Sequence, residues 1–171
     1  HDPRAYLLGE VAGHAGLFST ANDLALYAQM MLGQGTLQIS GSRPVQVLSP
    51  ATVARMTRGE RVTAGLRGLG WDLRSPYSIN RGDLLSPTAF GHGGFTGTVM
   101  WIDPDLDLFI IFLSNRLHPD GQGSVNDLAG RIANVVVSSL VEPTSSASER
   151  VETRTMPGVY TGIDRLVEDE F

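Results

Sequence analysis

The sequence has no cysteine among its 171 residues, which excludes a disulfide framework and a thiolate metal site. It also has no apolar run near the roughly 20 residues that a membrane-spanning helix needs. Its longest apolar run, residues 108–113, has only the length of a strand. Runs of basic residues are absent too, and the formal net charge is -5, which argues against a nucleic-acid surface. We therefore expect no nucleic-acid partner and no membrane span.

A secretory signal and an initiator methionine are also lacking. The chain opens on His1-Asp2-Pro3 and stops at Phe171, shortly after a helical pattern begins. We therefore expect both ends to lie inside a longer protein. The composition, with 42% hydrophobic and 18% charged residues, is that of a folded domain.

Helix signals occur at three places along the chain. Thr20 is the predicted N-cap of a helix over residues 21–32, with Asp23 three positions on. The Ser49-Pro50 pair predicts a second helix, ending near residue 57. Ser124 is predicted to cap a third. The predicted apolar side of this third helix is Leu128, Ile132, Val135, Val136 and Leu140.

Strand signals lie between these helices. Residues 69–73 alternate as a short strand, and residues 98–102 and 106–114 form a pair around an Asp-Pro-Asp turn. Strands joined so tightly are antiparallel, and the apolar character of the pair predicts a central position in the sheet. The expected fold is α+β, an antiparallel sheet flanked by helices.

The end of the chain has a different composition. Residues 143–157 are rich in serine and threonine with a proline at each end, which is typical of an interdomain linker. We therefore predict one domain over residues 1–142, a linker over 143–157, and the start of a second domain over 158–171.

One segment stands out chemically, residues 90–98 (FGHGGFTGT), where four glycines surround His92 just before the strand pair. Glycines at a strand edge allow close backbone approach to a ligand, and N–H groups there can form an oxyanion hole. A histidine beside them can move a proton near neutral pH. On the residues alone, a glycine-rich loop with a structural histidine is the commoner case.

Five short segments carry a family resemblance. They are residues 13–24 (GHAGLFSTANDL), 48–50 (LSP), 68–71 (GLGW), the glycine segment, and 102–116 from IDP to SNR. In this order they resemble landmarks of the class C β-lactamase, esterase and DD-peptidase family, over about residues 1–141. The resemblance implies a serine nucleophile in an S-x-x-K motif and a tyrosine in a second motif. The sequence contains neither motif in convincing form, so we expect both upstream of His1.

The third motif of that family corresponds to His92-Gly93-Gly94. The resemblance implies that His92 and the backbone N–H of Phe95 are catalytic, the latter as an oxyanion donor. It implies a substrate-binding role for His92, Gly93, Gly94, Phe95 and Thr96. No cofactor is implied, and the four histidines lack the spacing of a metal site, so we expect no metal.

Departures from the family motif refine the expected activity. His92 stands where lysine is commoner, and Gly93 replaces a threonine or serine whose hydroxyl helps to hold a substrate carboxylate. Weakened carboxylate recognition favours an esterase, peptidase or transacylase, acting on small or peptidoglycan-derived substrates, over an efficient β-lactamase. The alternative is a non-catalytic cell-wall binding module of the same fold. By the same resemblance we expect a periplasmic or secreted parent protein.

The last 14 residues carry a second resemblance. Residues 159–169 (VYTGIDRLVED) are similar to the opening of NamZ-type exo-β-N-acetylmuramidases. This resemblance implies a C-terminal fusion domain that acts on wall sugars.

Overall fold

A computed structural model describes residues 6–9 and 17–140. The chain divides into two units, His1–Val141 and Glu142–Phe171, and every described residue belongs to the first. The predicted linker and second domain lie outside the described residues. The helices are α2 (Ala21–Leu32), α3 (Pro50–Thr57), a short 3-10 helix η1 (Ser78–Arg81) and α4 (Asn126–Leu140).

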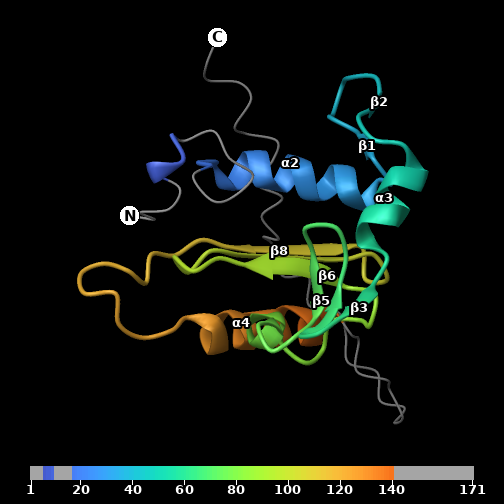
Figure 1. Cartoon of the computed structure of the whole chain (residues 1–171). Helices are drawn as coiled ribbons and strands as arrows, with labels where there is room; N and C mark the ends of the chain where they lie inside the picture. The colour runs from blue at the N-terminus through green and yellow to red at the C-terminus, as the bar shows by residue number, and fades with distance from the viewer. Residues whose placement is uncertain (1–5, 10–16, 141–171) are drawn as a thin grey trace, which may run out of the picture. The chain divides into compact units, whose positions relative to one another are not determined.

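The strands of the described residues form two antiparallel sheets (Figure 1). A small sheet pairs β1 (Thr36–Leu37) with β2 (Val45–Gln46). The main sheet contains six strands, each paired with the next along the chain. They are β3 (Glu60–Val62), β4 (Gly65–Arg67), β5 (Asp72–Arg74), β6 (Phe90–Gly93), β7 (Val99–Asp103) and β8 (Leu108–Phe112). The α+β fold with an antiparallel sheet is confirmed.

The predicted central position of the last strand pair is wrong for β8. Because the chain adds strands in sequence order, β8 pairs only with β7 and forms the edge of the described sheet. The apolar character of the pair has the expected cause, because helices α2 and α4 lie on opposite faces of the sheet (Figure 1). The predicted antiparallel pairing of β7 with β8 is confirmed.

Two apolar clusters form the core, one on each face. Met31 of α2 packs with Trp71, Phe90 and Ile102 in the first cluster. The second contains Val99 and Trp101 of β7 with Ala129 and Val137 of α4. Ile102 and Trp101 are neighbours that point to opposite faces, as the two-residue period of a strand requires. The exposed fraction is 0% for Ile102 and 1% for Trp101.

The first two predicted helix starts are confirmed. The Thr20 hydroxyl accepts a hydrogen bond from the backbone N–H of Asp23 at 3.1 Å. The Ser49 hydroxyl accepts one from the N–H of Thr52 at 3.1 Å, and Pro50 begins α3. Each cap satisfies one donor that a helix N-terminus leaves unpaired.

The third helix differs from its prediction in start and in face. It begins at Asn126, whose backbone N–H donates to the Ser124 hydroxyl at 3.2 Å. Its buried residues are Ala129, Gly130, Ala133 and Val137. Three residues of the predicted apolar side, Leu128, Val135 and Leu140, are more than half exposed.

Close approach to η1 is the reason for the small buried residues of α4. A Cβ at Gly130 would lie 2.6 Å from the backbone oxygen of Ile79. Only small side chains allow this approach at the buried face of α4. The apolar pattern alone does not show this distance.

The predicted strand over residues 69–73 begins late. The Gly68 N–H donates to the Trp71 oxygen at 3.0 Å and closes a turn. Gly70 adopts a φ of 78°, which favours glycine. The ladder therefore starts at Asp72 and continues to Arg74.

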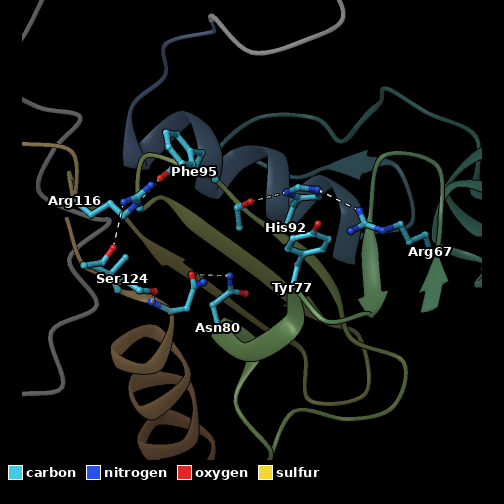
Figure 2. A pocket seen from close by; sticks show the side chains of 13 residues that line it. Arg67, Tyr77, Asn80, His92, Phe95, Arg116 and Ser124 are labelled. Atoms are coloured by element: carbon cyan, nitrogen blue, oxygen red, sulfur yellow. Dashed lines mark hydrogen bonds between the residues drawn. The ribbon is translucent and has the colours of Figure 1, made fainter. Parts of the chain in front are cut away.

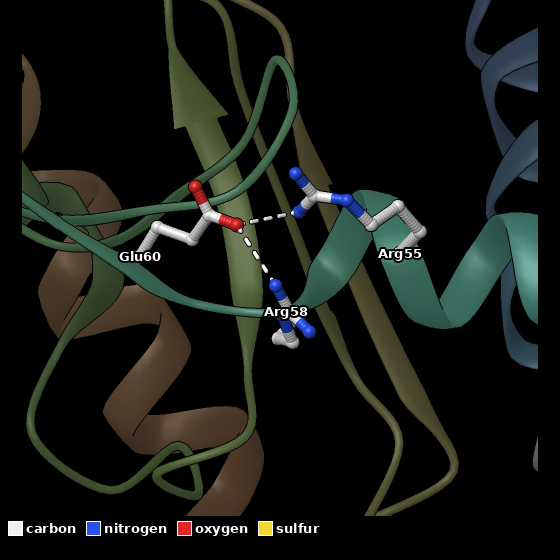
Figure 3. Close-up of polar contacts among 3 residues, drawn as sticks. All are labelled: Arg55, Arg58 and Glu60. Atoms are coloured by element: carbon white, nitrogen blue, oxygen red, sulfur yellow. Dashed lines mark hydrogen bonds and ion pairs between the residues drawn. The ribbon is translucent and has the colours of Figure 1, made fainter.

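A surface ion pair links α3 to β3 (Figure 3). Glu60 accepts hydrogen bonds from Arg55 at 2.7 Å and Arg58 at 3.1 Å. These bonds, with that from Arg58 the larger cause, hold the pKa of Glu60 below its usual value. All three side chains are exposed, so the pair contributes little to stability.

Over the described ranges, no helix is long and apolar enough to cross a membrane.

Candidate active site

The glycine segment forms β6 and the hairpin turn that leads into β7. His92 pairs with Met100 and Gly93 with Val99 across the two strands. Gly97 closes the hairpin with its N–H donating to the Gly94 oxygen at 3.0 Å. Its φ is 102°, and a Cβ there would lie 2.5 Å from the Ser114 hydroxyl oxygen. A glycine is therefore required at this turn.

A cavity of about 520 Å³ opens beside this hairpin (Figure 2). Four of the predicted site residues line it, namely His92, Gly93, Gly94 and Phe95. Thr96 is not among the lining residues, and its backbone oxygen accepts a hydrogen bond from the N–H of Arg116 at 3.0 Å. The remaining lining residues are Arg67, Tyr77, Asn80, Gly97, Arg116, Gly123, Ser124, Val125 and Asn126.

His92 is exposed at the cavity and has a partner at each ring nitrogen. Nδ1 lies 2.8 Å from the Gly93 backbone oxygen, which can only accept, so Nδ1 carries a hydrogen. In the neutral ring Nε2 is then the acceptor, and it lies 3.5 Å from a guanidinium nitrogen of Arg67. Figure 2 shows these two side chains pointing toward one another. The ring can accept a proton at Nε2 or, when charged, donate from it.

Gly93 has no room for a side chain, because Asn80 occupies that space. A Cβ at Gly93 would lie 2.1 Å from Asn80 Nδ2. Asn80 is buried, and its Oδ1 accepts a hydrogen bond from Trp101 Nε1 at 2.9 Å. Its Nδ2 donates to Asn126 Oδ1 at 3.3 Å. Two partners from different elements thus hold the amide in the place of the missing side chain.

Arg116 joins the loop after β8 to the hairpin. Its Nε donates to the Phe95 oxygen at 2.7 Å, and the guanidinium lies 4.3 Å from the centre of the Phe95 ring. One terminal nitrogen also donates to the oxygens of Gly121 at 2.9 Å and Gly123 at 3.2 Å. These contacts fix the backbone of Phe95, the residue predicted to supply an oxyanion donor.

A network of serine hydroxyls holds the turn that contributes Tyr77 to the cavity lining. The buried Asp72 carboxylate accepts from the hydroxyls of Ser75 and Ser78, each at 2.9 Å. The Ser75 N–H donates to Ser78 Oγ at 2.8 Å. The turn held in this way carries Tyr77, whose ring lies 5.7 Å from the Arg67 guanidinium carbon.

The structure brings to the cavity six polar side chains that the sequence alone did not assign to it, namely Arg67, Tyr77, Asn80, Arg116, Ser124 and Asn126. Two of them lie next to recognisable segments, since Arg67 precedes the GLGW segment and Arg116 ends the SNR segment. No local pattern marks Tyr77 or Asn80. Within residues 6–9 and 17–140, no group of three acidic or histidine side chains is placed to hold a metal ion.

Comparison with known proteins now decides the family. The sequence profile described as Beta-lactamase matches residues 1–134. The chain belongs to the beta-lactamase family. The fold agrees with this assignment, because a crystal structure of a beta-lactamase from Mycobacterium bovis matches with a TM-score of 0.52 at 26% identity. That match covers 71% of this chain and 44% of the other.

Curated proteins similar to this chain come from Salmonella. Those of Salmonella paratyphi B (strain ATCC BAA-1250 / SPB7) and Salmonella newport (strain SL254) are named "Putative D-alanyl-D-alanine carboxypeptidase". Each is 40% identical over 145 residues, which cover 82% of this chain. The chain spans 31% of the length of each relative.

Proposed function

We propose that this chain forms one wall of the active site of a serine acyl-hydrolase that cleaves acyl–D-alanyl peptides or related esters. The observation that carries the proposal is the clustering of His92, Gly93, Gly94 and Phe95 on one cavity, at the end of a strand. The family membership and the name of the Salmonella relatives support it. A location outside the cytoplasm, where wall peptides occur, is part of the proposal.

The proposed chemistry is acyl transfer through a serine that this chain does not supply. The serine oxygen attacks the acyl carbonyl, and the Phe95 N–H stabilises the negative charge on its oxygen. The leaving group departs with a proton, and water then hydrolyses the acyl-enzyme. His92 orients the substrate or moves a proton at Nε2. The sequence contains no lysine, so the lysine of the S-x-x-K motif must come from outside it.

A labelled penicillin tests the proposal directly. We expect the full gene product to be labelled stoichiometrically at one serine, because an activated nucleophile makes the covalent step possible. We expect the 171-residue chain alone to remain unlabelled. Mass spectrometry of the labelled peptide identifies the serine.

The controls separate the two candidate functions. Prior denaturation of the full gene product should abolish labelling, since only the folded site activates the serine. A full gene product that binds wall peptides without acylation would contradict the proposal. That result would favour the alternative, a non-catalytic cell-wall binding module of the same fold.

We also propose that the C-terminal residues begin a second domain that acts on wall sugars. Only the resemblance of residues 159–169 supports this fusion. Release of N-acetylmuramic acid from wall fragments by the full gene product, and its loss when the part after residue 157 is deleted, would test it.

A further inference from the structure

Asp72 is a buried carboxylate without an ion-pair partner in the part of the chain that the structure describes. It lies on β5 with 2% of its surface exposed. Its Oδ2 accepts from two serine hydroxyls, while its Oδ1 has no hydrogen-bond partner among the described residues. The ion pairs of those residues all involve Glu60. A buried charge is costly unless it is paired, so the two hydroxyl bonds compensate this carboxylate only in part.

The directions of the hydrogen bonds around Ser75 follow from this carboxylate. An ionised carboxylate can only accept, so the Ser75 hydroxyl donates its single hydrogen to Asp72. The same oxygen then accepts from the backbone N–H of Tyr77 at 3.2 Å and from a terminal nitrogen of Arg67 at 3.5 Å. Ser75 thus uses its one donor and both lone pairs, and its hydroxyl links the buried carboxylate to the guanidinium.

Arg67 reaches from this link to the candidate active site. It lies opposite Asp72 in the pairing of β4 with β5. Its second terminal nitrogen lies 3.5 Å from His92 Nε2, and its guanidinium carbon lies 5.7 Å from the centre of the Tyr77 ring. Figure 2 shows Arg67, Tyr77 and His92 grouped at one side of the cavity. Both polar contacts of Arg67 are longer than the usual ~2.9 Å, so neither fixes the guanidinium by itself.

The charge of Asp72 adds the attraction that these long contacts lack. Arg67 is half-buried and Asp72 is buried, so their attraction across one hydroxyl group is screened less than it would be in water. Ser75 also holds the backbone of Tyr77, whose ring faces the same guanidinium. One carboxylate therefore orients both the cation and the aromatic ring beside it.

Arg81 is a second cation near this carboxylate, but its contacts lie elsewhere. Its terminal nitrogen donates to the backbone oxygens of Leu85, at 2.9 Å, and Ser86. Burial lowers the pKa of Arg81, and Asp103 opposes this effect more strongly than Asp72 does. Among the described residues, Arg67 is the cation that shares a hydrogen-bond partner with Asp72.

We propose that Asp72 is a positioning residue of the candidate active site, which acts through Ser75 and Arg67 on His92. It holds the guanidinium so that one nitrogen is directed at Nε2, the ring nitrogen that accepts in the neutral histidine. The consequence for turnover rests on the proposed acyl-hydrolase function, in which Nε2 meets the substrate or the transferred proton. Asp72 itself contacts no substrate, because it is buried beneath the turn that carries Tyr77.

Two serine variants separate positioning from a purely structural role, because both serines donate to Asp72 and only Ser75 contacts Arg67. The readout is the NMR resonance of His92 Nε2 in the full gene product, assigned with His92→Ala. R67Q gives the position of this resonance without the guanidinium. S75A and D72N should move the resonance most of the way to the R67Q value, whereas S75T keeps the hydroxyl and should retain the wild-type value.

S78A is the matched comparison for stability. It removes a bond to Asp72 and also the acceptor of the Ser75 N–H, so it should lower the melting temperature at least as much as S75A. Because it leaves the link from Asp72 to Arg67 in place, it should move the His92 resonance less than S75A does. A resonance shift as large in S78A as in S75A would overturn the inference, and so would a wild-type resonance in S75A. If D72N does not fold, S75A carries the test.

Kinetics then separate the inference from the proposed function. With a D-alanyl ester as substrate, S75A should lower kcat/KM by about two- to tenfold, as expected for the loss of one hydrogen bond, and S78A should lower it less. The NMR comparison needs no turnover. The expected resonance shifts in a protein without hydrolase activity would support the positioning of Arg67 by Asp72 and contradict the proposed function. An active hydrolase whose resonance is unchanged in S75A would do the reverse.

Discussion

At the scale of single residues, the site depends on Gly93, which has no side chain, and on the Asn80 amide, which occupies the space beside it. Gly93 is a glycine because Asn80 lies where its Cβ would be. Asn80 in turn satisfies the buried indole N–H of Trp101. The Asn80 side chain thus couples Gly93 to the buried Trp101. Substitutions at Gly93 or Asn80 therefore affect both the cavity and the fold.

His92 gives the first prediction at this scale. In the full gene product, His92→Ala should lower kcat/KM for a D-alanyl peptide or ester by roughly ten- to a thousandfold, the range for losing a positioned polar or acid–base group. Its melting temperature should change little, because the side chain is exposed. His118→Ala, exposed and outside the cavity lining, is the matched control. Full activity of the His92 variant would show that the ring is structural.

The coupling of Gly93 to Asn80 gives the second prediction. Gly93→Ala should destabilise the protein by about 1–3 kcal/mol, because the new methyl group overlaps Asn80 Nδ2. Asn80→Ala should also destabilise it, because the Trp101 N–H loses its acceptor. The double variant should lose less than the sum of the two single losses, since the smaller residue removes the overlap. Urea unfolding measures all three, and strict additivity would contradict the coupling.

At the scale of elements, α4 shows how close packing overrides an apolar pattern. Its buried face contains two alanines, a glycine and a valine, while Leu128, Val135 and Leu140 are exposed. The backbone of η1 runs so close to Gly130 that a larger face could not fit. This contact helps to set the position of η1 and therefore of Asn80, and the first residue of α4, Asn126, itself lines the cavity.

Substitution of Gly130 tests this role of α4. Alanine is favoured over glycine in a helix by roughly 1 kcal/mol. We nevertheless expect Gly130→Ala to destabilise the protein, because the new Cβ would meet the Ile79 oxygen at 2.6 Å. Ser138→Ala, at an exposed position of the same helix, should be neutral or stabilising. A Gly130→Ala variant that melts at a higher temperature than the wild type would show that the packing is loose.

At the scale of the whole molecule, the described sheet leaves β8 with a neighbour on one side only. The exposed residues Leu128, Val135 and Leu140 of α4 add apolar surface. Unpaired edges and apolar patches of this kind favour association with another segment. Because the curated relatives are about three times as long as the matched region, we expect the full gene product to be more stable than this chain alone.

The predicted domain boundary has a proteolytic test. In a longer protein, limited digestion should cut first within residues 143–157, because a segment poor in apolar residues forms few protecting contacts. N-terminal sequencing of the fragments locates the cut. Cleavage within residues 98–140 before any cut in the linker would contradict the boundary.

The sequence by itself determined the features that depend on neighbouring residues. Thr20 and Ser49 start helices because their hydroxyls bond to backbone groups three residues on, and the Asp-Pro-Asp turn joins two apolar strands into an antiparallel pair. The HGG segment lies at the cavity, and its role in binding or catalysis stays a prediction. Each of these signals is local, so it can be read without knowing the fold.

Only the tertiary structure decided which distant residues meet at the cavity and which helix face is buried. Arg67 and His92 are 25 positions apart, and Asn80 reaches Gly93 only because α4 holds η1 against the sheet. The buried face of α4 follows from a distance between two backbones, which no apolar pattern encodes. Contacts between separate elements depend on how the strands align and how closely the helices approach, and these are properties of the folded chain.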